Sequence, residues 1–134
     1  MALKYVLDTH PLVWYLEGNP RLSQKAKAII DDPGNDLVLP IIALAEAAFI
    51  VERGRTSIPS PSDLLISVQS DPRLEVYPLT MTILQQSLGA ATIPEMHDRL
   101  ILATATQLRI LGHTVVLLTK DAFIARSGLI PIVW

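Results

Sequence analysis

Four acidic side chains stand at positions where a carboxylate has chemical uses. Asp8 directly follows the strand-like run "KYVL", and Asp121 comes two residues after the run "VVLLT". Asp98 lies in the opening turns of a helix predicted for "MHDRLILATATQL", whose later turns are almost wholly apolar. Glu46 is the one charged residue in the apolar stretch 41–51. A carboxylate in such places can cap a helix, bind a cation or transfer a proton, so its surroundings decide its role.

Glu46 raises the sharpest question because its own predicted helix offers it no partner. The residues three and four positions away, which share its helix face, are all apolar: Ile42, Ala43, Phe49 and Ile50. Burying an ionised carboxylate without a partner costs several kcal/mol, so such groups are usually paired or metal-bound. We therefore expect Glu46 to face a cation supplied from elsewhere.

Each of the other three acids also has an ordinary explanation. Asp8 can cap the next helix, Asp98 can favour a helix N-terminus or pair with Arg99, and Asp121 can begin a turn. Four carboxylates that converge on one crevice at strand ends would, however, repel one another strongly unless a cation lay between them. Their oxygen ligands suit Mg²⁺ or Mn²⁺ better than zinc, and such ions assist phosphoryl displacement by activating water.

Basic, histidine and aromatic residues near these acids are further candidates. Arg99 and Lys120 each adjoin a proposed metal-binding acid in sequence, where they could contact a phosphate or simply balance charge. His10 and His97 also adjoin such acids and could bind metal or shuttle a proton, although neighbours of this kind more often point away. Additional basic candidates are Arg53, Arg55 and Arg126. Bases could stack on Trp14, Tyr15 and Phe49, although packing in the core or an interface is the more common role of such residues.

Composition limits the class of protein. The 134 residues suit a single domain, 1–134, and carry a net charge of −2, so no global basic signal indicates nucleic-acid binding. The lack of cysteine excludes disulfides and a thiolate zinc site and is compatible with a cytoplasmic location. We expect no signal peptide and no membrane span. A hydrophobic fraction of 50% indicates either a well-filled core or an apolar surface reserved for a partner or a second copy.

Strand-like and helix-like segments alternate along the chain. Predicted strands cover 3–7, 37–39, 74–79, 114–119 and 129–134, and predicted helices cover 11–16, the segment after Ser23, 41–54, a segment ending at 68, 80–89 and a segment ending near 111. Thr92 and Glu95 have the spacing of a capping box for the last helix. This alternation predicts an α/β fold with a central, mostly parallel sheet between helices, in which sites form beyond the carboxyl ends of strands.

The chain resembles PIN-domain proteins, specifically VapC-like toxins of type II toxin–antitoxin systems. The resemblance lies in "VLDTH" with Asp8, "LAEAAF" with Glu46, "MHDRLILATA" with Asp98 and "LLTKD" with Asp121, in this order. Further similarity lies in "LSQKAKAII", "YPLT" and the ending "IPIVW". The residues before the Asp98-Arg99 pair depart from the common pattern of these toxins, in which Pro-Phe stands where this chain has Met96-His97.

The resemblance implies a PIN-like three-layer α/β/α sandwich and a Mg²⁺-dependent endoribonuclease, with Mn²⁺ as the alternative ion. Asp8, Glu46, Asp98 and Asp121 would be the catalytic, metal-binding acids, with metal-activated water attacking an RNA phosphodiester. Thr9 and Thr119 fall where the family often has supporting hydroxyl groups. The implied partners are RNA, a small DNA-binding antitoxin and a second copy of the chain, without a membrane.

Two other functions stay open at the level of sequence. A receiver-like phosphoacceptor domain has a similar length, an acidic Mg²⁺ site, a Thr and a Lys, which Thr119 and Lys120 superficially match. That class expects adjacent acids after the first strand, whereas Asp8 is followed by Thr9 and His10, and it gives Glu46 no role. The second alternative is a PIN-fold module that binds without catalysing.

Overall fold

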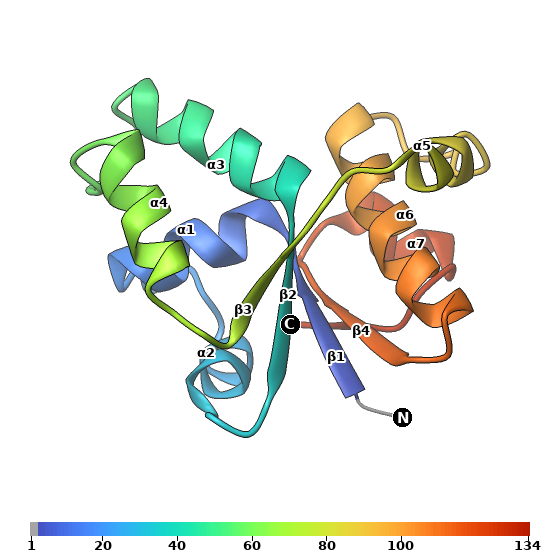
Figure 1. Ribbon diagram of the computed structural model, residues 1–134, viewed down its shortest axis with the longest axis horizontal. Coiled ribbons are helices and arrows are strands. Elements are labelled where there is room, and N and C mark those ends of the chain that lie inside the picture. Colours follow the sequence, from blue (N-terminus) through green and yellow to red (C-terminus); the bar gives the residue numbers. More distant parts are fainter. Residues whose placement is uncertain (1–2) are drawn as a thin grey trace.

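A five-stranded parallel sheet forms the centre of the computed structural model, which describes residues 3–134 (Figure 1). Its strands are β1 (Leu3–Leu7), β2 (Asp36–Pro40), β3 (Leu74–Tyr77), β4 (Thr114–Leu118) and β5 (Ile132–Val133), in the spatial order β3-β2-β1-β4-β5. Each neighbouring pair of strands is parallel, so each connection must cross a face of the sheet. The expectation of a central, mostly parallel sheet is confirmed.

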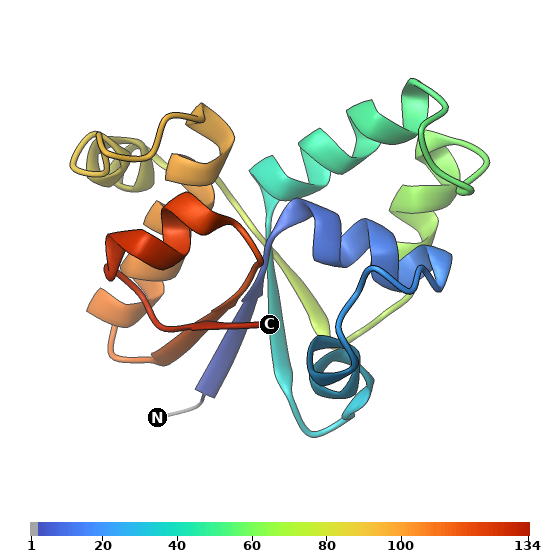
Figure 2. The ribbon, with the colours of Figure 1, turned by 180° about the vertical axis from the view of Figure 1, so that it is seen from behind.

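Helices cover both faces of this sheet. They are α1 (Thr9–Glu17), α2 (Gln24–Asp31), α3 (Ile41–Glu52), α4 (Pro61–Gln69), α5 (Met81–Ser87), α6 (Met96–Ile110) and α7 (Ala122–Ser127). Helices α1 to α4 lie on one side of the sheet and α5 to α7 on the other, as the two opposite views show (Figures 1 and 2). The molecule is therefore the predicted three-layer α/β/α sandwich.

The strand order reverses at β1, and this reversal determines where a site can form. Val6 of β1 is paired with Val38 of β2 on one side and with Leu117 of β4 on the other. Just beyond the two strands, the backbone N–H of Asp8 donates to the carbonyl of Leu118 at 3.1 Å. In parallel sheets the crevice for ligands opens at such a reversal, beyond the carboxyl ends of the strands.

The core explains why the central segments are so apolar. Val6 and Leu117, in the two middle strands, are fully buried because helices cover both faces of the sheet. Helix α6 packs against β4, α3 and α5, and its residues 100–105 are buried all round as a result. The single helix that carries Asp98 is therefore held by three neighbours.

Several helix boundaries differ from the predicted ones. Helix α1 begins at Thr9 rather than Pro11 because Asp8 caps it. The predicted capping box is wrong, since α6 begins after Glu95, whose side chain makes no capping hydrogen bond. Helix α7, which the sequence did not indicate, begins directly after Asp121. An acid stands at the N-cap in all three cases, and the side chains of Asp8 and Asp121 accept a capping hydrogen bond.

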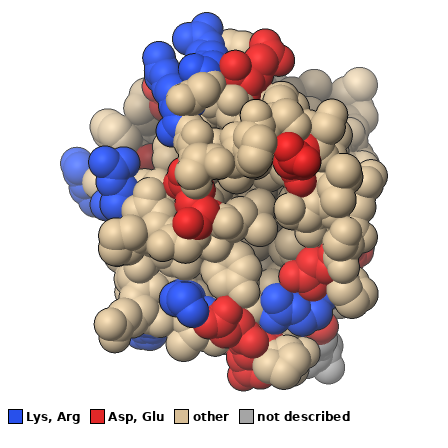
Figure 3. Space-filling view, turned by 90° about the vertical axis from the view of Figure 1, so that its left-hand side faces the viewer, with Lys and Arg blue, Asp and Glu red and all other residues tan. Residues whose placement is uncertain are grey.

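The surface of the face formed by α1 to α4 has no single sign of charge. Figure 3 shows acidic and basic side chains scattered over it, with broad uncharged areas between them. This distribution agrees with the small net charge of −2. Within residues 3–134, no helix has both the length and the apolar character needed to cross a membrane.

Truncating a buried side chain of α6 tests this packing. Ile101 is fully buried, whereas Ile110 on the same helix is 65% exposed. We expect Ile101→Ala to lower the free energy of unfolding by about 2–5 kcal/mol, because it leaves a cavity between α6 and the sheet. Ile110→Ala, the matched control, should change it by less than about 0.5 kcal/mol. Urea unfolding followed by circular dichroism measures both values, and equal effects would contradict the packing described for α6.

Candidate active site

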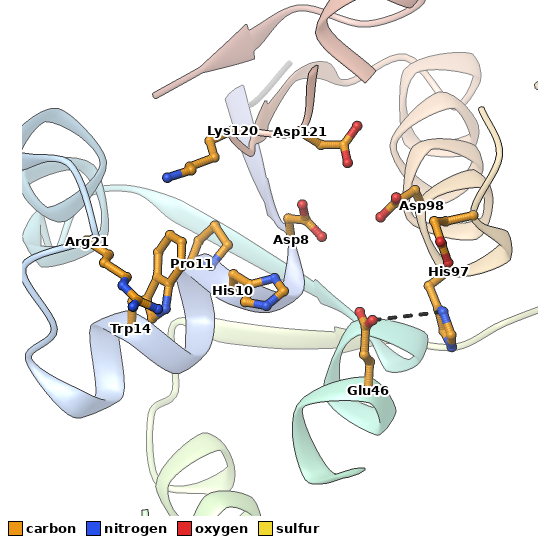
Figure 4. Close-up of a pocket in the computed structure, with 11 residues that line it drawn as sticks. Asp8, His10, Pro11, Trp14, Arg21, Glu46, His97, Asp98, Lys120 and Asp121 are labelled. Carbon is orange, nitrogen blue, oxygen red and sulfur yellow. Dashed lines mark ion pairs between the residues drawn. The ribbon is translucent and has the colours of Figure 1, made fainter. Parts of the chain in front are cut away.

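One cleft of about 520 Å³ opens beyond the carboxyl ends of β1 and β4 (Figure 4). Eleven residues line it: Asp8, His10, Pro11, Trp14, Arg21, Glu46, Glu95, His97, Asp98, Lys120 and Asp121. All four acids singled out by the sequence are among them, although they come from four separate segments of the chain. In Figure 4 the carboxylates of Asp8, Asp98 and Asp121 point toward a common space, with Glu46 on its lower side.

Asp8 is the most buried and most firmly held of the four acids. Its side chain follows β1 directly and the residue is only 7% exposed. One carboxylate oxygen accepts a hydrogen bond from the backbone N–H of Thr9 at 2.7 Å, and the other accepts one from the hydroxyl of Thr119, also at 2.7 Å. Burial nevertheless raises the pKa of Asp8, and the negative charge of Glu46 raises it further. The carboxylate is thus fixed in place while its charge remains poorly compensated.

Glu46 finds its contacts on other helices. Its Oε1 accepts a hydrogen bond from the hydroxyl of Thr9 on α1, and its Oε2 lies 3.9 Å from Nδ1 of His97 on α6. Among the described residues, no Lys or Arg nitrogen lies within 4.0 Å of this carboxylate. The expected cation partner is therefore not a Lys or Arg of residues 3–134, and Glu46 lines the cleft from the side of α3.

Asp98 and Asp121 face each other across the cleft. Burial raises the pKa of Asp98 to about 7, and the negative charges of Asp8, Asp121 and Glu46 raise it too, as does a hydrogen bond with Asp121. Asp121 also accepts a hydrogen bond from the backbone N–H of Ile124 at 2.9 Å, which caps α7. No ion pair joins Asp98 to Arg99 in the described part of the chain, so the pairing does not explain Asp98. The other ordinary explanation holds, since Asp98 lies in the first turn of α6.

The donor chemistry of this cleft fits a hard divalent cation. Its acids offer carboxylate oxygens, which Mg²⁺ and Mn²⁺ prefer. Burial, and after it the neighbouring negative charge, raises the pKa values of Asp8 and Asp98, and a bound cation would offset both effects. As they stand, however, no three acidic or histidine side chains of residues 3–134 are close enough together to hold an ion. The four carboxylates therefore line the cleft, but among the described residues no three of them lie close enough to share one ion.

Of the basic and histidine candidates, Lys120, His10 and His97 line the cleft, and Arg99 lies away from it. Lys120 lines the cleft, but its ammonium group points away from the acids and lies 5.3 Å from the ring centre of Trp14 and 5.9 Å from that of Trp134. His10 also lines the cleft and is exposed. Arg99 does not line it, because its guanidinium donates to the backbone carbonyls of residues 91 and 93.

The hydroxyl groups of Thr9 and Thr119 act behind the carboxylates rather than in the cleft. Both threonines are almost fully buried, and each donates its hydroxyl proton to one of the acids, Glu46 and Asp8 respectively. The Thr119 hydroxyl also accepts a hydrogen bond from the backbone N–H of Asp121 at 3.0 Å. A single buried hydroxyl thus connects the acids that follow β1 and β4.

Sequence reasoning missed two charged residues of this cleft, Glu95 and Arg21. Glu95 was considered only as part of a capping box, although its place just before His97 and Asp98 already puts it at the same helix end. Arg21 lies in the connection between α1 and α2, where no local pattern reveals which way the chain returns. Only the fold brings Arg21 to the cleft.

Comparison with known families agrees with this architecture. The family model described as the PIN domain matches residues 5–127, and the chain belongs to this family. The resemblance drawn from the sequence is thereby confirmed. Among curated proteins, no sequence matches the chain significantly.

Solved structures of toxin–antitoxin systems share the fold. A crystal structure of VapBC2 from Rickettsia felis bound to a promoter DNA fragment contains a chain with a TM-score of 0.71 and 19% identity, covering 97% of each chain. DNA-bound VapBC from Salmonella typhimurium gives a TM-score of 0.70 at 18% identity, covering 98% of this chain and 97% of the other. A toxin–antitoxin complex from Klebsiella pneumoniae gives 0.69 at 17%, covering 100% and 97%. At these identities the likeness establishes the fold.

The raised pKa of Asp98 predicts a pH-dependent stability. The folded protein holds this proton up to about pH 7, whereas an unperturbed aspartate releases it near 3.8. The unfavourable contribution of the Asp98 charge therefore grows as the pH rises from about 4 through about 7 and is complete above that range. We expect Asp98→Asn to stabilise the metal-free protein more at about pH 8 than at about pH 5.

Urea unfolding in the presence of EDTA measures this difference. Asp36→Asn is the matched control, because Asp36 is exposed and begins β2 at the end of the sheet opposite the cleft. Its effect on the free energy of unfolding should not follow the same rise with pH. If the effect of Asp98→Asn were equal at both pH values, the raised pKa of Asp98 would be disproved.

Proposed function

We propose that this PIN-domain chain is a metal-dependent endoribonuclease that acts as the toxin of a toxin–antitoxin pair. The observation that supports the proposal most directly is the convergence of Asp8, Glu46, Asp98 and Asp121 on one cleft. The cleft also contains Arg21 and Lys120, and within residues 3–134 neither has a carboxylate oxygen within 4.0 Å. Such a cleft offers carboxylates for a divalent ion and cations for a phosphate. Action on RNA in the cytoplasm is part of this proposal.

The acids would hold Mg²⁺, or Mn²⁺ in its place, directly or through water. When bound, the ion would supply the charge that lowers the pKa of a water nucleophile and stabilises the attacking and leaving oxygens of the phosphodiester. The hydroxyls of Thr9 and Thr119 keep the Glu46 and Asp8 carboxylates oriented toward the cleft. His97, beside Glu46, stands where it can donate a hydrogen bond to that carboxylate or to substrate.

The two alternative functions are weaker explanations of the same cleft. A receiver-like phosphoacceptor gives no role to Glu46, and the family match is to the PIN domain. A PIN module that only binds would not need four carboxylates with so little compensating charge around them. The nuclease proposal accounts for all four.

Asp8→Asn tests the proposal directly. The change keeps the size of the side chain and one acceptor oxygen but removes the charge that we assign to metal binding. We expect cleavage of cellular RNA in the presence of Mg²⁺ to fall by about 100-fold or more, because even residues that merely support metal ligands contribute about 10- to 100-fold. Sequencing RNA ends after brief expression of both forms measures the loss and identifies the cleavage sites.

Two controls make the outcome specific. EDTA should abolish cleavage by the unaltered chain and added Mg²⁺ should restore it, while Asp36→Asn should cleave normally. Circular dichroism must show that Asp8→Asn is folded. If the folded Asp8→Asn protein cleaved as fast as the unaltered protein, the catalytic assignment would be refuted and the module that only binds would be favoured.

The proposed protein partners are a small DNA-binding antitoxin and a second copy of the chain. The VapBC structures that share the fold are complexes bound to DNA, which supports an antitoxin partner. An apolar stripe on α5 and its C-cap residue, Leu88, supports self-association, because Met81, Leu84 and Leu88 are 69%, 44% and 70% exposed. These three side chains lie three and four residues apart and so share one helix face.

Replacing apolar side chains of the α5 stripe by charged ones tests self-association. We expect the unaltered chain to form dimers in light-scattering measurements, and Leu84→Glu combined with Leu88→Glu to give monomers, because burying two unpaired carboxylates in an interface is unfavourable. Ile110→Glu, on an exposed part of α6, is the control and should remain dimeric. A monomeric unaltered chain at high concentration would exclude a dimer of this kind.

A further inference from the structure

Lys120 lies beside four carboxylates and forms an ion pair with none of them. The residue is exposed and lines the candidate active site together with the four acids. Within residues 3–134, however, no carboxylate oxygen lies within 4.0 Å of its ammonium nitrogen. Opposite charges attract each other strongly in a partly buried cleft, so another interaction must hold the ammonium group back.

The length of the lysine side chain does not explain this separation. Asp121 follows Lys120 directly in the chain, and Asp8 accepts a hydrogen bond from Thr119, the residue before Lys120. A lysine carries its charge on a long, flexible stem that can turn toward carboxylates this close to its own backbone. In Figure 4, however, the side chains of Lys120 and Asp121 extend in opposite directions from the same segment. The ammonium group is therefore held on the other side of this segment.

Two indole rings lie on that other side. The ammonium nitrogen of Lys120 is 5.3 Å from the ring centre of Trp14 and 5.9 Å from that of Trp134. An ammonium group within about 6 Å of an aromatic ring centre is attracted by the negative face of the ring, and tryptophan gives the strongest attraction of this kind. The two rings therefore compete with the carboxylates for the same cation.

The fold fixes both rings in place. Trp14 is only 8% exposed, and its ring meets that of Trp134 edge to face, with the ring centres 5.9 Å apart. Trp134 directly follows β5, which pairs with β4, and the backbone N–H of Thr119 donates to the carbonyl of Val133 at 3.3 Å. The pairing of these two strands thus places Trp134 beside the segment that carries Lys120.

We propose that Trp134 is a positioning residue that, together with Trp14, holds the Lys120 ammonium group out of the acidic cleft and so keeps the carboxylates available to a divalent cation. An ammonium group among the carboxylates would neutralise part of the charge that attracts the ion and would repel the ion itself. Trp134 does not line the cleft, so it acts through Lys120. The inference rests on the proposed metal-dependent function and adds to it a residue that sets the affinity for the ion.

Mn²⁺ binding to the metal-free chain, measured by isothermal titration calorimetry, tests this role without any cleavage step. Trp134→Leu keeps an apolar side chain but removes the aromatic ring, so Lys120 becomes free to pair with a carboxylate. We expect this change to weaken Mn²⁺ binding by about 10-fold, as loss of a residue that supports metal ligands does. Trp134→Phe, which retains an aromatic face, should restore most of the affinity.

A double-mutant cycle separates this role from a purely structural one. Lys120→Met alone should bind Mn²⁺ at least as tightly as the unaltered chain, because it removes a positive charge from beside the site. When Lys120→Met is already present, Trp134→Leu should no longer weaken binding, since no ammonium group remains to enter the cleft. An equal loss with and without Lys120→Met, or no loss in either case, would overturn the inference.

A second pair of a cation and an aromatic ring provides the matched control. The guanidinium group of Arg53 lies 4.4 Å from the ring centre of Phe49 on α3, and neither residue lines the cleft. Phe49→Leu removes a ring from a cation in the same way and should leave Mn²⁺ binding unchanged. If Phe49→Leu weakened binding as much as Trp134→Leu, the specific role of Trp134 would be refuted.

These outcomes remain distinguishable from those for the proposed function. If the unaltered chain and Trp134→Leu bound Mn²⁺ equally well and both cleaved RNA, the positioning role would fail and the nuclease would stand. If the Mn²⁺ affinities changed as expected but the unaltered chain did not cleave RNA with Mg²⁺ or Mn²⁺, the nuclease would fail and the positioning role would stand.

Discussion

Repulsion among carboxylates at the ends of β1 and β4 is the constraint on which the rest of the site depends. The reversal of strand order at β1 brings Asp8 and Asp121 together, and the packing of α3 and α6 adds Glu46 and Asp98. Burial makes this crowding costly, as the raised pKa values of Asp8 and Asp98 indicate. Buried hydroxyls fix the acids without neutralising them, so the fold tolerates a charge that a bound cation would balance.

The small net charge conceals how acidic and basic side chains are distributed around the candidate active site. A chain with a net charge of −2 gives no global sign of a polyanionic partner, yet Arg21 and Lys120 line the same cleft as the four acids. The rings of Trp14 and Trp134 contribute to this distribution, because they hold the Lys120 ammonium group away from the carboxylates. Local arrangement, and not composition, determines what such a surface can attract.

Sequence patterns predicted the sheet and singled out the four acids that line the cleft, because both depend on local order along the chain. An acid directly after an apolar strand, such as Asp8, must lie at the strand's carboxyl end, and an isolated acid such as Glu46 on an apolar helix must find a partner elsewhere. The direction of Arg99 and the approach of Arg21 were not predictable, since each depends on how distant segments pack. The start of α6 was mispredicted because capping spacing occurs at Thr92 without the capping geometry.

The hydrogen bond between Asp8 and Thr119 joins residues separated by 111 positions. On the ribosome, β1 and α1 emerge long before β4, and parallel pairing between distant strands is slow to form. A nascent chain therefore carries its first acid without the partners that orient it. Any activity that needs the complete pocket begins only when synthesis has passed β4, which delays the onset of that activity within the cell that makes the protein.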